Sequence, residues 1–187
     1  GDKSTFEIVR RIENKYFQVF SGWASKKETP WTERKIIEIA KYWNCAKVGI
    51  DAGAGTLGVS VLDHLRESEI KNKVVPLNNR AIVIEEKDDK QVKQKLLGED
   101  MHINLLSMMQ TGEIKLLKKD EIIASLESFQ YEYVKTAGQI TRLRIFTTRE
   151  AHGDSDIVEG LKRAAWLAKK EKTLNLFATH SGAKHGI

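Results

Sequence analysis

The stretch that decides the fold reads Ala46-Lys47-Val48-Gly49-Ile50-Asp51, followed by the glycine-rich turn Ala52-Gly53-Ala54-Gly55-Thr56-Leu57-Gly58. The short apolar run up to Ile50 predicts a buried strand, and apolar residues recur at helical spacing after the turn. A second strand is expected over Lys73–Leu77, so the two strands and the helix between them form a parallel crossover. Ligands in such sheets bind at the carboxyl ends of the strands, where Asp51 and the glycines lie.

The residues before this unit predict a hairpin and a helix. Thr5–Ile12 alternates apolar and polar residues, and Tyr16–Phe20 is rich in aromatic and β-branched residues, which is typical of two paired strands. A helix is expected over Pro30–Asn44, because proline is favoured at the first helical position and apolar residues follow at helical spacing.

The second half of the chain predicts more helices and one more hairpin. We expect helices over Asp100–Gln110, from Asp120 onward and over Ser155–Lys170, a strand over Glu113–Leu117, and a hairpin of Tyr131–Thr136 with Ile140–Thr147. Asn78–Gly98 is charged and poorly periodic, which predicts an exposed excursion. The fold class is therefore α/β: one mixed sheet with helices on both faces and an extra β-hairpin, in a single domain over 1–172 with a tail over 173–187.

The composition excludes some classes of protein and is consistent with others. The chain has 187 residues with 31 Lys and Arg against 26 Asp and Glu, and this net charge of +5 is consistent with a polyanionic partner without establishing one. Cys45 is the only cysteine, which excludes an internal disulfide and a zinc site built from several thiolates. The sequence predicts no membrane span and no signal peptide, so we expect a soluble intracellular protein.

Two acidic motifs are candidates for chemistry. Asp51 ends a predicted strand beside small residues, which leaves its carboxylate open to a metal ion or a ligand. Asp154 and Asp156 follow His152 at the start of the last helix, and neighbouring carboxylates favour an oxygen-bound Mg²⁺ or Mn²⁺. Each motif also has a purely structural interpretation, a tight turn for the first and helix N-capping for the second.

The catalytic interpretation of the two motifs is favoured if their acidic residues lie close together in the folded chain. If the last helix packs its N-terminus across the strand that ends at Asp51, the acids converge in a ribonuclease H-like arrangement. Paired metal ions held by such carboxylates drive in-line phosphodiester hydrolysis.

Three segments of the sequence are informative together: Val48-Gly49-Ile50-Asp51-Ala52-Gly53-Ala54-Gly55, Val74-Val75-Pro76-Leu77 and His152-Gly153-Asp154-Ser155-Asp156-Ile157-Val158-Glu159-Gly160-Leu161. They resemble the nuclease domain of viral large terminase subunits of the tailed-phage type. The stretch from Asn104 to Leu126 is also similar to the middle region of that family, so the resemblance covers nearly the whole chain.

The resemblance implies a ribonuclease H-like endonuclease that cuts concatemeric double-stranded viral DNA with two divalent ions, Mg²⁺ or Mn²⁺. Asp51 is implied as the second catalytic acid, and Asp156, or else Asp154, as the third, because Asp156 precedes Glu159 as the family's acid precedes a second acid. His152 is implied to lie near the metals. The implied partners are double-stranded DNA, an ATPase domain, the small terminase subunit and the portal, in the cytoplasm of an infected host cell and with no membrane association.

The sequence departs from the family in one respect. The family's first catalytic aspartate lies on a strand a few residues before a Gly-Asp-x-x-Thr stretch, which here is Gly1-Asp2-Lys3-Ser4-Thr5, and that strand is not recognised. Asp2 matches an accessory acid of the family, and Glu7 lies on the first visible strand, so both are candidates to contribute in its place. A Walker A sequence is also lacking, so the packaging ATPase is expected elsewhere.

Basic residues of the second half are candidate DNA contacts, although solvated surface charge is the alternative for each. Arg142 and Arg144 share one face of a predicted strand, which suits a ridge against phosphates. The other candidates are Arg149, Lys162, Arg163, Lys169 and Lys170. No aromatic pattern predicts base stacking.

Three alternatives remain open. A junction resolvase of the same general fold would prefer branched DNA. A docking module that keeps the fold without catalysis would bind DNA in a salt-dependent way and leave it uncut. A sugar-kinase or actin-like ATPase would use Asp51–Gly58 as a phosphate loop, but that fold needs a second lobe that 187 residues barely allow.

Overall fold

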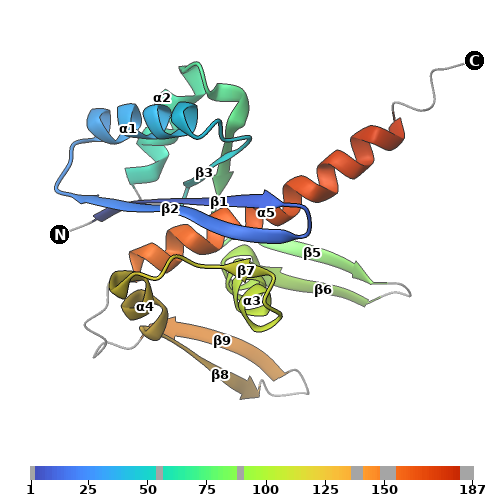
Figure 1. Ribbon diagram of the computed structural model, residues 1–187. Coiled ribbons are helices and arrows are strands. Elements are labelled where there is room, and N and C mark those ends of the chain that lie inside the picture. Colours follow the sequence, from blue (N-terminus) through green and yellow to red (C-terminus); the bar gives the residue numbers. More distant parts are fainter. Residues whose placement is uncertain (1–2, 54–56, 88–90, 136–140, 148–154, 182–187) are drawn as a thin grey trace, which may run out of the picture.

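The computed structural model describes residues 3–53, 57–87, 91–135, 141–147 and 155–181. A long antiparallel strand pair crosses the middle of the molecule, with helices on both sides of it (Figure 1). The described part is thus a mixed α/β fold, as predicted.

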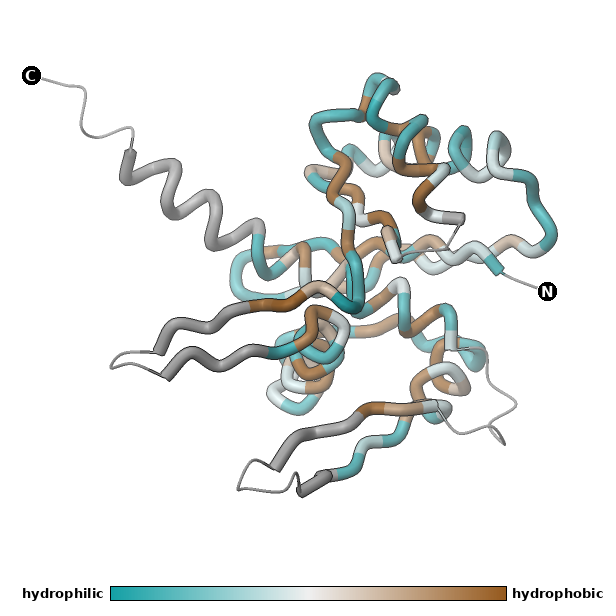
Figure 2. The backbone as a smooth tube through the Cα atoms, turned by 180° about the vertical axis from the view of Figure 1, so that it is seen from behind, coloured by the Kyte–Doolittle hydropathy of each residue, from teal (hydrophilic) through white to brown (hydrophobic). Residues whose placement is uncertain are grey.

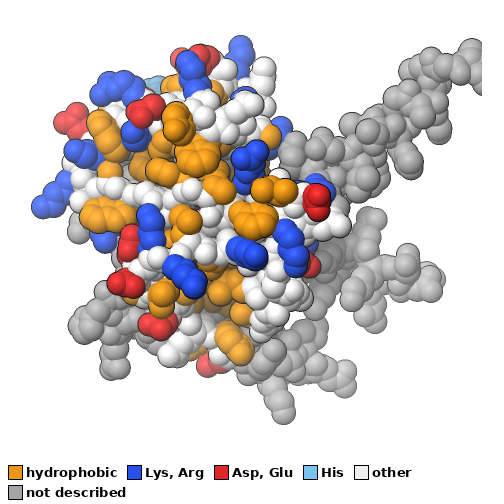
Figure 3. Space-filling model, viewed as in Figure 1, with side chains coloured by type: hydrophobic (Ala, Val, Ile, Leu, Met, Phe, Trp, Pro, Cys, Tyr) orange, Lys and Arg blue, Asp and Glu red, His pale blue; other side chains and the backbone are white. Residues whose placement is uncertain are grey.

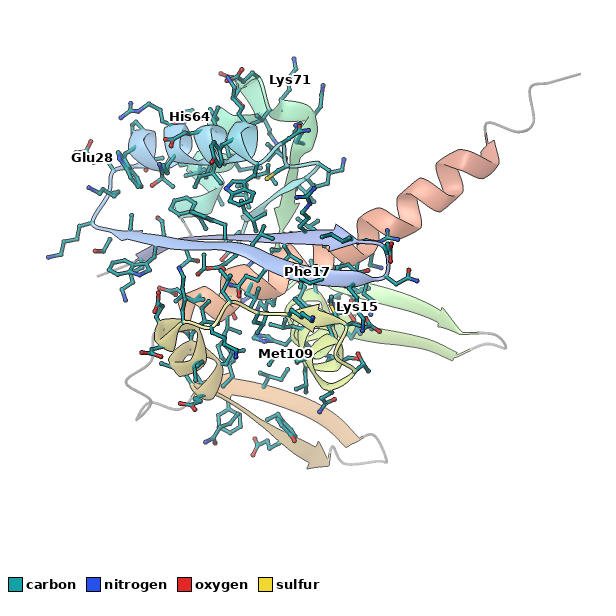
Figure 4. The ribbon with its side chains drawn as sticks, in the orientation of Figure 1. Lys15, Phe17, Glu28, His64, Lys71 and Met109 are labelled. Carbon is teal, nitrogen blue, oxygen red and sulfur yellow. The ribbon has the colours of Figure 1, made fainter. Side chains whose placement is uncertain are left out.

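The central pair consists of β1 (Lys3–Ile12) and β2 (Lys15–Ser25), which are antiparallel and joined by a tight turn. The short strand β7 (Ile114–Lys115) adds to β2 in parallel and completes a mixed three-stranded sheet in the order β1-β2-β7. Lys15 at the start of β2 donates a hydrogen bond from Nζ to the carbonyl of Gly112, at 2.9 Å, just before β7 (Figure 4). The amino-terminal hairpin is therefore confirmed, and its strands are longer than predicted.

The crossover unit is also confirmed. Strand β3 (Val48–Asp51) pairs in parallel with β4 (Val74–Leu77), and the helix α2 (Leu57–Glu67) and the short 3-10 turn η1 (Lys71–Lys73) connect them. The helix α1 (Thr29–Tyr42) packs beside α2, where Nδ1 of His64 lies 2.5 Å from Oε1 of Glu33 (Figure 4).

On the other side of the central pair lie α3 (Leu97–Gln110), α4 (Asp120–Glu127) and the long helix α5 (Asp156–Ser181). α5 crosses β1 closely, because Gly160 has no side chain: an added Cβ would lie 3.0 Å from Cγ of Glu7 and 3.0 Å from Oγ1 of Thr5. α5 extends to Ser181, beyond the domain boundary predicted at residue 172.

Two hairpins extend from the body (Figure 1). β5 (Ile82–Lys87) pairs with β6 (Gln91–Leu96) in the segment that we expected to be an exposed excursion, and the sequence did not predict that these residues form a hairpin. β8 (Phe129–Lys135) pairs with β9 (Thr141–Thr147), which confirms the second predicted hairpin.

The prediction of one continuous sheet was wrong among the described residues. The strands form the mixed sheet β1-β2-β7 and three separate pairs, β3-β4, β5-β6 and β8-β9. The core is divided in the same way: one cluster joins β2, α3, β7 and α5, another joins α1, β3 and α2, and a third joins β4 to α3. Figure 2 shows the hydrophobic segments gathered where these elements meet.

The surface gives weaker information on function. Lys and Arg side chains are scattered among apolar ones over the face seen in Figure 3, rather than gathered in one stripe. Of the helices described, none combines the length and the apolar character that crossing a membrane requires.

Candidate active site

Asp51 is the last residue of β3, where the parallel pair β3-β4 ends. Its Oδ1 accepts a hydrogen bond from the backbone N–H of Gly53 at 3.2 Å, so the small residues of the turn orient the carboxylate. The side chain is 42% exposed, which leaves the carboxylate accessible to a ligand.

The start of α5 lies on the same cavity as Asp51. Asp156 is the first residue of the helix, and its carbonyl accepts a hydrogen bond from Oγ1 of Thr5 at 3.0 Å, which fixes the helix start against β1. A cavity of about 1230 Å³ is lined by acidic residues from three elements: Glu7 of β1, Asp51 of β3, and Asp156 and Glu159 of α5. Asp156 and Asp51 thus line one large cavity, from the first residue of α5 and the last residue of β3, and their convergence on one metal site stays a prediction.

Arg163 joins the two acidic motifs. Its Nη2 lies 3.1 Å from Oδ2 of Asp51, and its Nη1 lies 3.1 Å from Oε2 of Glu159, one turn earlier on the helix. Nη2 also donates to Oδ1 of Asn79 at 3.2 Å. A single buried guanidinium thus neutralises two carboxylates that would otherwise repel each other.

Glu159 is held by a second buried cation. Nζ of Lys162 donates to Oε1 of Glu159 at 2.6 Å and lies 2.8 Å from Nε2 of His102. Because an ammonium group can only donate, Nε2 of His102 is the acceptor, and the ring is neutral with its proton on Nδ1. The approach of Nε2 to Oε1 of Glu159, at 3.1 Å, is then a contact that the shared ammonium holds together.

The pKa values follow from this arrangement. Burial by itself raises the pKa of Glu159, but the hydrogen bonds and charges of His102, Lys162 and Arg163 outweigh it and hold the pKa well below its ordinary value. Burial lowers the pKa of His102 and that of Lys162, in spite of the nearby Glu159. The network therefore keeps Glu159 ionised and His102 neutral near pH 7.

Glu7 is the acidic residue that β1 contributes. Its carboxyl group accepts hydrogen bonds from Nε2 of Gln18 at 2.7 Å and from Oγ of Ser21 at 2.8 Å, both on β2. Burial raises the pKa of Glu7 to about 7, although these hydrogen bonds and the charge of Lys119 oppose the increase. Glu7 is therefore poised between its charged and neutral forms near neutral pH.

Several predicted site residues lie outside the described residues or are described only in part. His152, Asp154 and Arg149 belong to the segment 148–154, which the structure does not describe. Arg142 and Arg144 lie on β9, opposite Val134 and Glu132 of β8, and only their backbone is described. Their proposed roles stay predictions.

Lys162 was predicted to contact DNA, and the structure contradicts this role. The residue is 1% exposed and its ammonium is hydrogen-bonded inside the protein, so it does not present a charge to a phosphate. Arg163, at 7% exposed, is buried in the same way. The sequence showed both as basic residues of a helix, but it did not show that α3 and β3 cover that face of the helix.

Two members of the network were missed by sequence reasoning. His102 and Asn79 carry no local motif, and each meets Glu159 across a long separation in the sequence. Only the positions of α3 and of the β4–β5 connection bring them to the site.

The donor set of the cavity suits a hard divalent cation, because all its anionic groups are carboxylates and Arg163 already occupies the position of a cation between two of them. Among the described residues, no three Asp, Glu, His or Cys side chains are close enough to form a complete metal site. Asp51 and Asp156 would provide part of such a site.

The described residues define a mixed α/β fold in which carboxylates from a strand end and a helix start share one cavity. No protein-family model matches the chain, and no curated protein sequence matches it significantly. Among solved structures, the chain is similar to the large terminase nuclease from the thermophilic phage G20c, a crystal structure with bound cobalt. The TM-score is 0.55 at 16% identity, over 88% of this chain and 81% of that chain. The resemblance inferred from the motifs is thereby confirmed at the level of the fold.

Proposed function

We propose that this chain is the metal-dependent nuclease domain of a terminase large subunit of the tailed-phage type. The observation that carries the proposal is that Asp51, at the end of β3, and Asp156, at the start of α5, line one cavity in a fold shared with a phage terminase nuclease. The reaction is hydrolysis of phosphodiester bonds in concatemeric double-stranded DNA.

Asp51 and Asp156 are the residues that would hold divalent ions, together with Asp154 in the segment that is not described. Bound Mg²⁺ or Mn²⁺ supplies an activated water and stabilises the leaving oxygen in this class of reaction. The chain's own contribution is positioning: Gly53 and Arg163 orient the carboxylate of Asp51, and Thr5 fixes the first residue of α5. His152 is proposed to assist proton transfer.

DNA contact is proposed for Arg142, Arg144 and Arg149, whose cationic side chains suit phosphates. If the domain acts in a packaging motor, its partners are an ATPase domain, a small terminase subunit and a portal, in the cytoplasm of the infected host. The ribonuclease H-like assignment belongs to the same proposal.

Nicking of supercoiled plasmid tests the function. We expect nicking with Mn²⁺ or Mg²⁺ and none with EDTA, and we expect Asp51→Asn and Asp156→Asn each to lower the rate by about a hundredfold or more. Asp63→Asn is the matched control, because Asp63 lies on α2 and is exposed, with its carboxylate 3.5 Å from Arg66. Nicking that survives EDTA, or that both site variants retain, would contradict the proposal.

The competing interpretation is a docking module without catalysis. It is favoured by one observation: Arg163, rather than a group of three or more ligands, holds Asp51 and Glu159 among the described residues. Salt-sensitive DNA binding without cleavage in any divalent ion would establish it. Cleavage confined to branched DNA would indicate a junction resolvase instead.

A further inference from the structure

The two faces of the sheet β1-β2-β7 have different surroundings. Tyr16 and Ile114 are buried on the face that packs against α3 and α5, and Glu7 lies on the same face. α1 packs on the opposite face, where the ring centres of Phe20 and Trp43 lie 6.1 Å apart. The hairpin extends past α1 toward the turn between β1 and β2 (Figure 1).

Beyond α1, one row of three side chains crosses this opposite face. Phe17, near the start of β2 (Figure 4), pairs directly with Arg10 of β1 and with Lys115 of β7, and residues paired in this way point to the same face. Nζ of Lys115 accordingly lies 5.8 Å from the centre of the Phe17 ring. Arg10 and Lys115 are exposed, Phe17 is half-buried, and Ile12, two residues after Arg10 on the same face, is 49% exposed. We call Arg10, Ile12, Phe17 and Lys115 the β2 platform.

Aromatic side chains continue from the β2 platform toward α1. Phe17 and Phe20 are three residues apart, which in a regular strand would place them on opposite faces. A register shift in the pairing of β1 and β2 lies between them, so that both rings share one face. Trp43 and Tyr42 extend the series beside Phe20, and Tyr42 is 83% exposed. The sequence pattern does not show this aromatic surface, because it depends on the shift and on residues from separate elements.

The cations of the β2 platform are available to a ligand. Within the part of the chain that the structure describes, Arg10 forms no ion pair, and Lys115 contacts the ring of Phe17. Glu113, just before β7, has its carboxylate 3.7 Å from Nζ of Lys169, so its charge is already compensated. The β2 platform is therefore positively charged, and we expect its ligand to be an anion.

An aromatic ring with a cation on either side suits single-stranded nucleic acid. A base stacks on the ring while the phosphates before and after it meet the cations. Neighbouring strands lie about 4.8 Å apart, so the backbones of Arg10 and Lys115 are roughly 10 Å apart with Phe17 between them. A duplex keeps the faces of its bases stacked inside and offers none to Phe17. A folded protein partner favours a contiguous apolar patch, which the cations interrupt here.

We propose that the β2 platform binds single-stranded nucleic acid, with a base stacked on Phe17 and phosphates against Arg10 and Lys115. Phe17 and Lys115 lie outside the residues that line the acidic cavity, and the β2 platform is on the face of the sheet opposite Glu7. The proposal goes beyond the cleavage of double-stranded DNA and does not depend on nuclease activity.

Fluorescence anisotropy of a labelled 15-nucleotide thymidine strand, titrated in EDTA at several salt concentrations, tests the proposal. We expect Phe17→Leu, which keeps an apolar side chain without an aromatic face, to weaken binding by about tenfold or more. Arg10→Gln and Lys115→Gln should each weaken binding and reduce the slope of log K against log salt by about 0.7.

Two variants are matched controls for these substitutions. Trp23→Leu removes an aromatic ring that is 53% exposed on the opposite face of β2, where Nζ of Lys3 lies 4.9 Å from the ring centre. Lys71→Gln removes an exposed lysine far from the β2 platform (Figure 4). Both should leave the affinity for the strand within about twofold of the parent value.

Three results would overturn the proposal. The first is the absence of strand binding at low salt, or strand binding that Phe17→Leu leaves unchanged. The second is equal affinity for an abasic strand of the same length, which would leave charge without stacking. The third is displacement of the strand by an equal concentration of a 15-residue glutamate peptide, which would assign the face to an acidic protein. If Phe17→Leu does not fold, the abasic comparison and the two glutamine variants, which change exposed side chains, decide the question.

Discussion

Lys162 shows how a buried residue can be mistaken for a binding residue. A lysine at 1% exposure is costly unless its charge is compensated, and here Glu159 and His102 provide the compensation. Its role is to hold Glu159 ionised beside Arg163, next to Asp51. Lys162 is therefore a positioning residue of the acidic site.

The variant Lys162→Met tests this role. It removes the ammonium that donates to Glu159 and occupies the lone pair of His102, so we expect a loss of about 1–3 kcal/mol in the free energy of unfolding at pH 7. We also expect the pKa of His102 to rise, because Nε2 becomes free to donate to Glu159. Urea denaturation measures the first effect, and the NMR titration of the imidazole measures the second.

Lys169→Met is the control for Lys162→Met, because Lys169 is exposed and lies 3.7 Å from Glu113. Its effect should stay within about 0.5 kcal/mol. A Lys162→Met variant of unchanged stability whose DNA binding becomes less sensitive to salt would restore the surface role that the sequence predicted.

Candidate residues of the site could be predicted where the features that mark them are adjacent in the sequence, and not where they depend on distant residues. Asp51 was predicted because a strand end and a glycine-rich turn are adjacent in sequence, and Asp156 because it starts a helix. The burial of Lys162 could not be predicted, because its partner His102 lies 60 residues away on another helix. Glu7 was named as a candidate, but its raised pKa depends on how β2 and α5 cover it.

At the scale of elements, the contact between α5 and β1 determines the positions of the acidic residues on these two elements. Gly160 permits this contact, since an added Cβ would meet Glu7 and Thr5 at 3.0 Å. In an open helix Gly→Ala stabilises by about 1 kcal/mol, but here the crowding should cancel that gain. Gly160→Val should cost about 1–3 kcal/mol and displace the first turn of α5 from Asp51.

Thermal unfolding of Gly160→Ala and Gly160→Val checks this contact, with Lys169→Val as the control for placing a β-branched residue at an exposed position of α5. We expect the valine variant at residue 160 to lose plasmid nicking as well as stability. If Gly160→Ala were more stable than the parent by about 1 kcal/mol, the full difference in helix propensity, α5 and β1 would not be in close contact at this position.

The elements with strong local patterns were predicted, and those defined by long-range pairing were not. The alternation in β1 and β2 and the crossover from β3 to β4 could be read from the sequence, because each depends on neighbouring residues. The β5-β6 hairpin was missed, because both strands carry several charged residues and neither shows a clear alternation of apolar and polar residues along the sequence. Propensity is a weak guide where packing does not stabilise the strands.

At the scale of the molecule, the division of the sheet accounts for both the cavity and the site. The cluster of α1, β3 and α2 and the cluster of β2, α3, β7 and α5 are separate cores, and the cavity that Asp51 and Asp156 line lies between them. Arg163 links the two sides through its ion pair with Asp51. The sequence could predict the strands on either side, but the gap is visible only when their edges are placed in space.

Two carboxylates should together set how the stability of the metal-free protein depends on pH. The pKa of Glu7 is raised to about 7, so its contribution to stability is complete below its unfolded value of 4.5 and is lost as the pH rises toward 7. The pKa of Glu159 is lowered, so its contribution is present above 4.5 and lost as the pH falls. Stability in EDTA should therefore be greatest near pH 5.

The variant Glu7→Gln isolates the first of these effects. It imitates the neutral carboxyl group and keeps a partner for Ser21, so it should remove the decline in stability between about pH 5 and pH 8, which we expect to be about 1–3 kcal/mol in the parent. Urea denaturation at both pH values in EDTA measures it, with the exposed Glu121→Gln as the control. A parent protein that is more stable at pH 8 than at pH 5 would show that solvent reaches Glu7 from the cavity that it lines and keeps its carboxylate hydrated.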